Sequence, residues 1–125
     1  MLDYQPTKEE IINTLAYMIG TENYYSYKTL FISVNLTDGV KYLCESCKCY
    51  WLIDIVLSYQ LSKKVKRESF QTWTLSRIED NNFQIVATDG NETTLARQDI
   101  PFSDFPLDTI KLFFINGVIM LTSEY

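Results

Sequence analysis

Residues 49–61, with the sequence CYWLIDIVLSYQL, are apolar at most positions, and this segment limits the folds that are open to the chain. Asp54 and Ser58 are the polar interruptions before Gln60, so a helix built from the segment is apolar nearly all the way round. Such a helix lies in the middle of a fold. It is too short for a membrane span, which needs roughly 20 mainly apolar residues. We therefore expect a central, buried helix that ends near Ser62.

The size and composition of the chain indicate one domain. Its 125 residues are 46% hydrophobic and 14% aromatic, which is enough material for one core. The N-terminal sequence MLDYQPTKEE has neither the basic nor the apolar region of a secretion signal. Three cysteines do not make a disulfide framework. We expect a single globular domain over residues 1–125, located in the cytoplasm.

The first helix is predicted over residues 7–19. Thr7 and Glu10 match a capping box, in which each side chain bonds the backbone N–H of the other residue. Apolar side chains then fall on one stripe, and Gly20 is a typical helix stop. Segment 21–35 is ambiguous. It fits a short helical turn that carries three tyrosines, whereas its second part has a strand-like composition.

The next helix is predicted to begin at Thr37. The Thr37 side chain can cap the helix, and Asp38 in the first turn favours the helix dipole. Apolar residues follow at helical spacing as far as Cys47. Lys48 and Cys49 then mark a tight joint into the central helix.

From Phe70 onwards apolar and polar residues alternate, as they do in half-buried strands. Asn116-Gly117 is a strong signal for a hairpin turn because both residues tolerate positive φ. Residues 101–106 begin and end with proline, which fits a loop and not a central strand. The predicted strands cover residues 70–75, 83–88, 93–100, 109–115 and 118–122.

Helices that come first and strands that follow predict an α+β fold. In this fold the N-terminal helices of residues 1–62 pack on one face of a C-terminal antiparallel β-meander. The meander has about five strands and covers residues 68–125.

Charge and the lack of histidine exclude several kinds of function. The chain has no histidine, which removes Ser-His-Asp and Cys-His nucleophile systems and His-ligated zinc. The net charge is -5. Residues 1–67 hold eight basic and seven acidic side chains, and residues 68–125 hold three basic and nine acidic side chains. An acidic second half repels nucleic acid and can attract a basic protein surface. Acidity of this size is also ordinary for a soluble protein.

Five segments of the chain resemble a known family. They are TDGVKYL (37–43), YWLID (50–54), the C-terminal stretch 105–125 that begins FPLD and ends SEY, GTENYY (20–25) and FQTWTL (70–75). The family is one of unknown function, made of small single-domain bacterial proteins from cyanobacteria, plasmids and phages. The resemblance covers most of the chain and implies no activity and no site residues. It implies that small residues other than cysteine are usual where this chain has its three cysteines.

The three cysteines, Cys44, Cys47 and Cys49, form a C-x-x-C-x-C pattern that can suggest zinc or redox chemistry. A structural zinc site takes four ligands, and the remaining one would have to be Glu45, Asp54 or water. A thioredoxin-type motif follows a strand, whereas these residues join two predicted helices. We favour buried or half-buried free thiols and expect no metal and no cofactor.

The run KKVKR contains Lys63, Lys64, Lys66 and Arg67 and is the one charge run of the sequence. With nearby aromatic residues it could contact a phosphate backbone. We favour the alternative, in which the charges follow a buried helix, interact with its C-terminal dipole and keep a connecting loop in water.

Asp54 is the most informative single carboxylate, because within an apolar helix it must reach the surface or find a partner. Lys41 is a candidate partner, and Tyr24 or Tyr25 can donate a hydroxyl. With these residues Asp54 could line a small-molecule pocket or form an acid/base pair with Glu22. We favour a structural role, a satisfied polar link that fixes helix packing.

Two functions remain open. We favour a non-catalytic accessory or protein-interaction protein, and the resemblance suggests an association with mobile elements. The alternative is a small-ligand or nucleic-acid binder that uses the Glu22, Tyr24, Tyr25, Lys41 and Asp54 region or the basic run. A protein partner is expected, nucleic acid and membrane are not, and the sequence does not distinguish a monomer from a homodimer.

Overall fold

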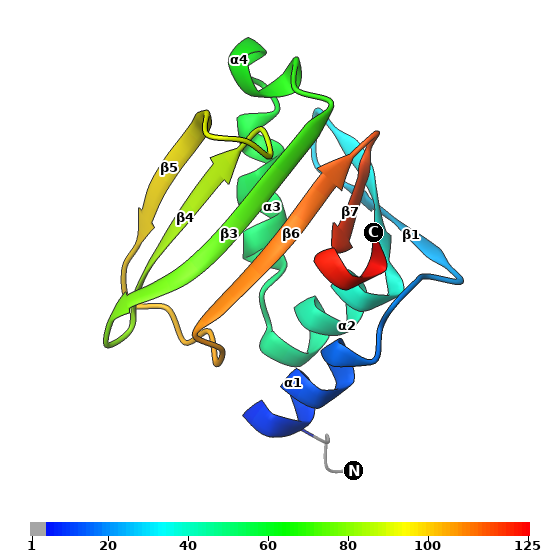
Figure 1. Ribbon diagram of the computed structural model, residues 1–125, viewed down its shortest axis with the longest axis vertical. Helices are drawn as coiled ribbons and strands as arrows, with labels where there is room; N and C mark the ends of the chain where they lie inside the picture. Colours follow the sequence, from blue (N-terminus) through cyan, green and yellow to red (C-terminus); the bar gives the residue numbers. More distant parts are fainter. Residues whose placement is uncertain (1–4) are drawn as a thin grey trace.

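A computed structural model describes residues 5–125 of the chain (Figure 1). Residues 1–4, part of the stretch used above to argue against a secretion signal, lie outside the described residues. In chain order the elements are α1 (Lys8–Ala16), β1 (Tyr24–Lys28), β2 (Ser33–Thr37), α2 (Asp38–Cys47), α3 (Tyr50–Tyr59), α4 (Lys63–Lys66), β3 (Phe70–Glu79), β4 (Asn82–Thr88), β5 (Thr94–Ile100), β6 (Thr109–Ile115), β7 (Val118–Leu121) and the 3-10 turn η1 (Thr122–Glu124).

One seven-stranded mixed sheet, in the order β1-β2-β7-β6-β3-β4-β5, runs through the fold. An α+β fold is therefore correct, but the prediction of about five strands in a meander is wrong. β3, β4 and β5 form a meander, whereas β6 returns to the other side of β3. β7 then pairs with β2 in parallel, with Asn35 opposite Val118. The helices are also not an N-terminal block, because α2, α3 and α4 follow two strands.

The tyrosine-rich segment is strand β1, not a helical turn. It pairs antiparallel with β2, with Tyr25 opposite Leu36 and Tyr27 opposite Val34. Tyr25 and Tyr27 are half-buried, while the alternating residues Tyr24, Ser26 and Lys28 are exposed. Pairing with β2 decides between the two alternatives, and such pairing between strands is not visible in local composition.

The predicted helix starts are confirmed. Glu10 N donates to Thr7 Oγ1 at 3.1 Å and Thr7 N donates to Glu10 Oε1 at 3.0 Å, which completes the capping box. α1 ends at Ala16 and not at residue 19, because Tyr17 and Met18 bond carbonyls three residues back. Asn116 and Gly117 have the positive φ values, 50° and 78°, of a hairpin turn.

The central helix α3 packs through one stripe of side chains. Leu52, Ile53, Val56 and Leu57 are almost fully buried, whereas Asp54 and Ser58 are exposed. The joint to α2 is tight, since Lys48 adopts a left-handed conformation with φ of 54°. No helix within residues 5–125 is long and apolar enough to cross a membrane.

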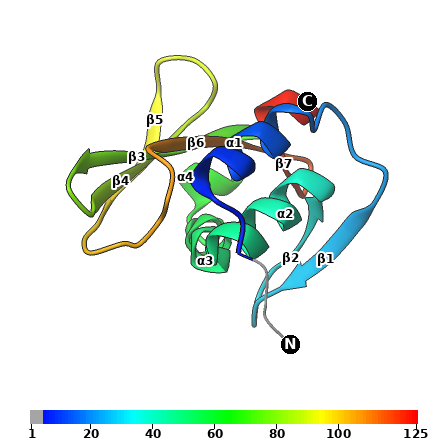
Figure 2. The same cartoon turned by 90° about the horizontal axis from the view of Figure 1, so that it is seen from below.

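One face of the sheet packs against helices. Figures 1 and 2 show α2 and α3 on the same side of the strands, and the 3-10 turn η1 on the other side, next to β6. The C-terminal Tyr125 lies against two aromatic rings there, 5.9 Å from Phe70 and 5.4 Å from Phe113 between ring centroids.

The N-terminus of α2 is held by the C-terminal turn of the chain. Glu124 Oε2 accepts a hydrogen bond from Gly39 N at 3.0 Å. Glu124 Oε1 accepts from Thr37 Oγ1 at 2.7 Å and from Leu121 N at 2.9 Å. A carboxylate at this position satisfies backbone donors that a helix leaves unpaired and has a favourable interaction with the helix dipole.

Gly39 is required at this contact by close approach. A Cβ at position 39 would overlap Leu121 Cδ1 and lie 2.6 Å from Glu124 Oε1. We predict that Gly39→Ala lowers the free energy of unfolding by about 1–3 kcal/mol, because both contacting groups are held in place. Chemical denaturation measures this change.

Gly20→Ala is the matched control, because nothing lies within 4 Å of a Cβ built at Gly20. It should change the free energy of unfolding by less than about 0.5 kcal/mol. Equal effects of the two substitutions would contradict the proposed contact at Gly39.

Candidate functional site

Three of the five residues predicted to form a site, Glu22, Tyr25 and Lys41, meet around Asp38 and not around Asp54. The Tyr25 hydroxyl donates to Asp38 Oδ1 at 3.0 Å. The backbone N–H groups of Glu22 and Asn23 donate to Asp38 Oδ2 at 2.9 and 3.3 Å. Lys41 Nζ lies 4.3 Å from the centre of the Tyr25 ring, where the cation meets the negative face of the ring.

These contacts give the Asp38 group a structural role. The backbone N–H of Glu22, followed by the Tyr25 hydroxyl, holds the pKa of Asp38 below its usual value. The hydrogen bond to Asp38 raises the pKa of Tyr25. Both Asp38 oxygens therefore accept from groups that fix the chain before β1 onto α2, and Glu22 participates through its backbone.

Asp54 lies apart from this group, and the prediction that it contacts Lys41, Tyr24 or Tyr25 is wrong. Its Oδ1 accepts from the Tyr27 hydroxyl at 2.6 Å, and the Tyr27 ring stacks on Tyr50 with centroids 5.6 Å apart. Burial and the bond to Asp54 raise the pKa of Tyr27. Alternation along β1 turns Tyr25 and Tyr27 towards the helices and Tyr24 away from them, leaving Tyr24 60% exposed.

The three cysteines are free and buried, as the favoured interpretation predicted. Cys44 Sγ lies 3.9 Å from Cys49 O, and Cys49 Sγ lies 3.7 Å from Leu43 O. A hydrogen bond with Cys49 and burial raise the pKa of Cys47, and the hydrogen bond with Cys44 raises the pKa of Cys49. The thiolate is the reactive and metal-binding form of cysteine, so these two thiols are poor nucleophiles. Within residues 5–125, no three His, Cys, Asp or Glu side chains are grouped to hold a metal ion.

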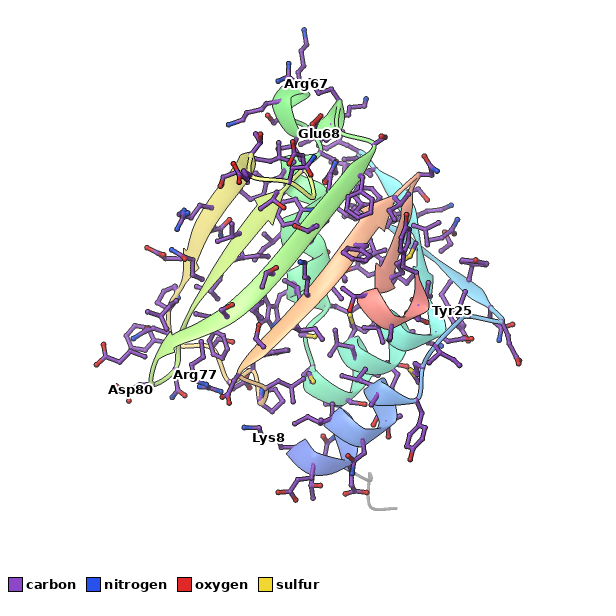
Figure 3. The ribbon with its side chains drawn as sticks, viewed as in Figure 1. Lys8, Tyr25, Arg67, Glu68, Arg77 and Asp80 are labelled. Atoms are coloured by element: carbon purple, nitrogen blue, oxygen red, sulfur yellow. The ribbon has the colours of Figure 1, made fainter. Side chains whose placement is uncertain are left out.

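The basic run forms the short helix α4 and not a loop, with Val65 buried beneath it. Its four cationic side chains are exposed, as expected, and none of them forms an ion pair with a described residue. Figure 3 shows Arg67 and Glu68 at one end of the molecule, far from Lys8, Arg77 and Asp80. In Figure 1 the β1–β2 and β6–β7 turns lie towards this same end.

A cavity of about 730 Å³ opens between α4 and these two turns. Its lining comes from three separate stretches of the chain, within residues 31–34, 60–71 and 114–117. The residues are Phe31, Ile32, Ser33, Val34, Gln60, Leu61, Lys63, Lys66, Glu68, Ser69, Gln71, Phe114, Asn116 and Gly117.

Two buried glutamines form a rigid part of the cavity wall. Gln60 Nε2 donates to Gln71 Oε1 at 2.8 Å, and Gln71 Nε2 donates to Gln60 Oε1 at 3.0 Å. Gln71 also donates to Val65 O at 2.9 Å and accepts from Trp73 Nε1 at 3.0 Å. These bonds tie α3, α4 and β3 together, so this side of the cavity is preformed.

A second hollow, of about 200 Å³, lies beside the first and shares Phe31, Ile32 and Leu61 with it. Asp54 lines this second hollow. Two of the shared side chains are exposed, Phe31 at 74% and Leu61 at 62%, and the neighbouring Leu30 is 87% exposed. We name Leu30, Phe31 and Leu61 the apolar ridge.

Sequence reasoning placed Lys63, Lys66 and Asp54 in two unrelated candidate sites, and the structure brings them to neighbouring hollows. It missed the apolar ridge and the glutamine pair. The signal for the ridge was the apolar run Leu30-Phe31-Ile32 between two strands, where turns normally carry polar residues.

Comparison with known proteins identifies the family. The profile described as "Family of unknown function (DUF6876)" matches residues 9–125, and the chain belongs to this family. Comparisons with the curated proteins and with the solved structures give no match.

The Asp38 contacts predict a specific pH dependence of stability. Because the folded-state pKa of Asp38 is lowered, the charged carboxylate stabilises the fold above the unfolded-state pKa of about 3.9. This stabilisation is lost as the pH falls through the folded-state pKa. We predict that Asp38→Asn is less stable than the wild type at pH 7 and that the difference narrows below about pH 4. Thermal unfolding at a series of pH values measures it.

Tyr25→Phe serves as the comparison for this experiment, because it removes one donor and keeps the carboxylate. Tyr25→Phe should retain most of the loss of stability that the wild type shows at acid pH. A constant difference between Asp38→Asn and wild type across the whole pH range would contradict the assigned role of Asp38.

Proposed function

We propose that this protein is a non-catalytic interaction protein that binds a segment of a protein partner at the α4 end. The binding surface comprises the apolar ridge and the two hollows on its sides. The observation that carries the proposal is the exposure of Leu30, Phe31 and Leu61 together at the mouth of a preformed cavity.

Exposed apolar side chains that are grouped, and not scattered, mark interaction surfaces. Each ridge residue loses favourable burial energy while it faces water, and a partner that covers the ridge recovers it. Large side chains beside pockets are typical of the few residues that dominate interface affinity. The ridge and cavity together have this form.

The carboxylates and thiols support a binding role over catalysis. Asp38 accepts hydrogen bonds from the Glu22 and Asn23 backbone and the Tyr25 hydroxyl, which occupy it structurally. The raised pKa values of Cys47 and Cys49 keep these buried thiols protonated at neutral pH.

A small-molecule ligand is the second candidate. A volume of about 730 Å³ lies within the range of drug-sized ligand sites. A molecule confined to this cavity would leave Leu30 uncovered, since Leu30 lines only the second hollow of the two. The exposure of the whole ridge therefore favours an extended partner.

Selection of short peptides from a random library against the purified protein tests the proposal. We predict that the selected peptides lose about 10-fold or more in affinity when Phe31 is replaced by alanine, because burial of a phenylalanine contributes about 1.5–3 kcal/mol. Fluorescence anisotropy with labelled peptides measures the affinity.

Phe102→Ala is the matched control, because Phe102 is 90% exposed and lines neither hollow. It should leave peptide affinity unchanged. Peptides that bind Phe31→Ala as well as wild type would contradict the proposed surface.

A further inference from the structure

We infer that the partner segment is dipolar: it carries an acidic residue at one end, bulky apolar residues in the middle, and a basic or hydrogen-bond-donating residue at the other end. This inference rests on the proposed function and specifies the partner of the same surface. It follows from opposite charges in the two hollows on either side of the apolar ridge.

The larger cavity carries the positive end of the surface. Lys63 and Lys66 line it and form no ion pair with a described residue, while Glu68 is the one carboxylate in the lining. Lys64 and Arg67 belong to the same charge run but are not part of the lining. Two exposed ammonium groups at a largely apolar cavity can bind a carboxylate while an adjacent apolar side chain enters.

The smaller hollow carries the negative end. Asp54 is its one charged lining residue, beside Thr29 and Ser58. Asp54 Oδ1 accepts from the Tyr27 hydroxyl, and no described protein group donates to Oδ2. An exposed carboxylate with one oxygen available favours an ammonium, guanidinium or N–H donor and repels an anion.

The ridge joins the two ends. Phe31, Ile32 and Leu61 line both hollows, so a chain that crosses the ridge has a hollow on each side for an apolar side chain. A nucleic acid fits this surface less well, because a phosphate backbone would meet Asp54 at the far side of the ridge. The net charge of -5 adds to this repulsion.

Synthetic peptides with one leucine-rich centre and different ends test the inference. One peptide has glutamates at one end and lysines at the other, made in both chain directions. The others have glutamates at both ends, lysines at both ends, or glutamines at both ends. Fluorescence anisotropy at low and high salt measures their affinities for the full chain.

We expect the dipolar peptide, in one chain direction, to bind about 3- to 10-fold more tightly than the glutamine peptide at low salt, and high salt to reduce this gain. The double variant Lys63→Gln/Lys66→Gln should remove the gain. Lys64→Gln/Arg67→Gln, which removes the same charge from the same basic run but outside the cavity lining, should keep the gain. Asp54→Asn should improve binding of the peptide with glutamates at both ends.

The outcomes separate this inference from the proposed function. If all the peptides bind equally whatever their end groups, and Phe31→Ala still weakens binding, the inference of a dipolar partner is wrong and the proposed surface stands. If no peptide binds, both are contradicted. Displacement of the dipolar peptide by a thymidine oligonucleotide that depends on Lys63 and Lys66 would also overturn the inference, in favour of nucleic acid. Circular dichroism of each variant verifies that it is folded.

Discussion

The N-terminus of α2 is the point on which the arrangement of the chain depends. Asp38 binds the segment that leads into β1, and Glu124 binds Gly39 N and Thr37 Oγ1 from the C-terminal turn. Asp38 N in turn donates to Thr21 Oγ1 at 2.8 Å. The N-terminus of α2 thus connects sequence positions about 100 residues apart. It does so where β1 pairs with β2 and β2 pairs with β7. The two carboxylates, of Asp38 and Glu124, lie at the helix end where the dipole favours negative charge.

This junction lies apart from the apolar ridge and the basic run of the proposed binding surface. The GTENYY, TDGVKYL and SEY segments meet there, because Glu22 N donates to Asp38 and Gly39 N donates to Glu124. The apolar ridge, Lys63 and Lys66 lie outside these segments. The junction and the α4 end, where we place partner recognition, are therefore separate parts of the molecule.

The sequence predicted the features that depend on short-range physics. The Thr7–Glu10 capping box, the Thr37 cap and the Asn116-Gly117 turn each involve residues within three or four positions, and each is correct. It did not predict β1 as a strand or the parallel β2–β7 pair, since both need partners far along the chain. The sequence divided the site into unrelated parts for the same reason. Asp54 bonds Tyr27, one of several nearby tyrosines, and the cavity lining comes from three separate stretches of the chain.

Amide hydrogen exchange of a Glu124→Gln variant tests the central claim, that the α2 junction is one cooperative unit distinct from the α4 end. We expect faster exchange in residues 21–40 and 118–125, because the weakened contact frees both sides of the junction. Exchange in residues 56–71, around the glutamine pair and α4, should not change. Faster exchange confined to residues 122–125, or spread into residues 56–71, would contradict it.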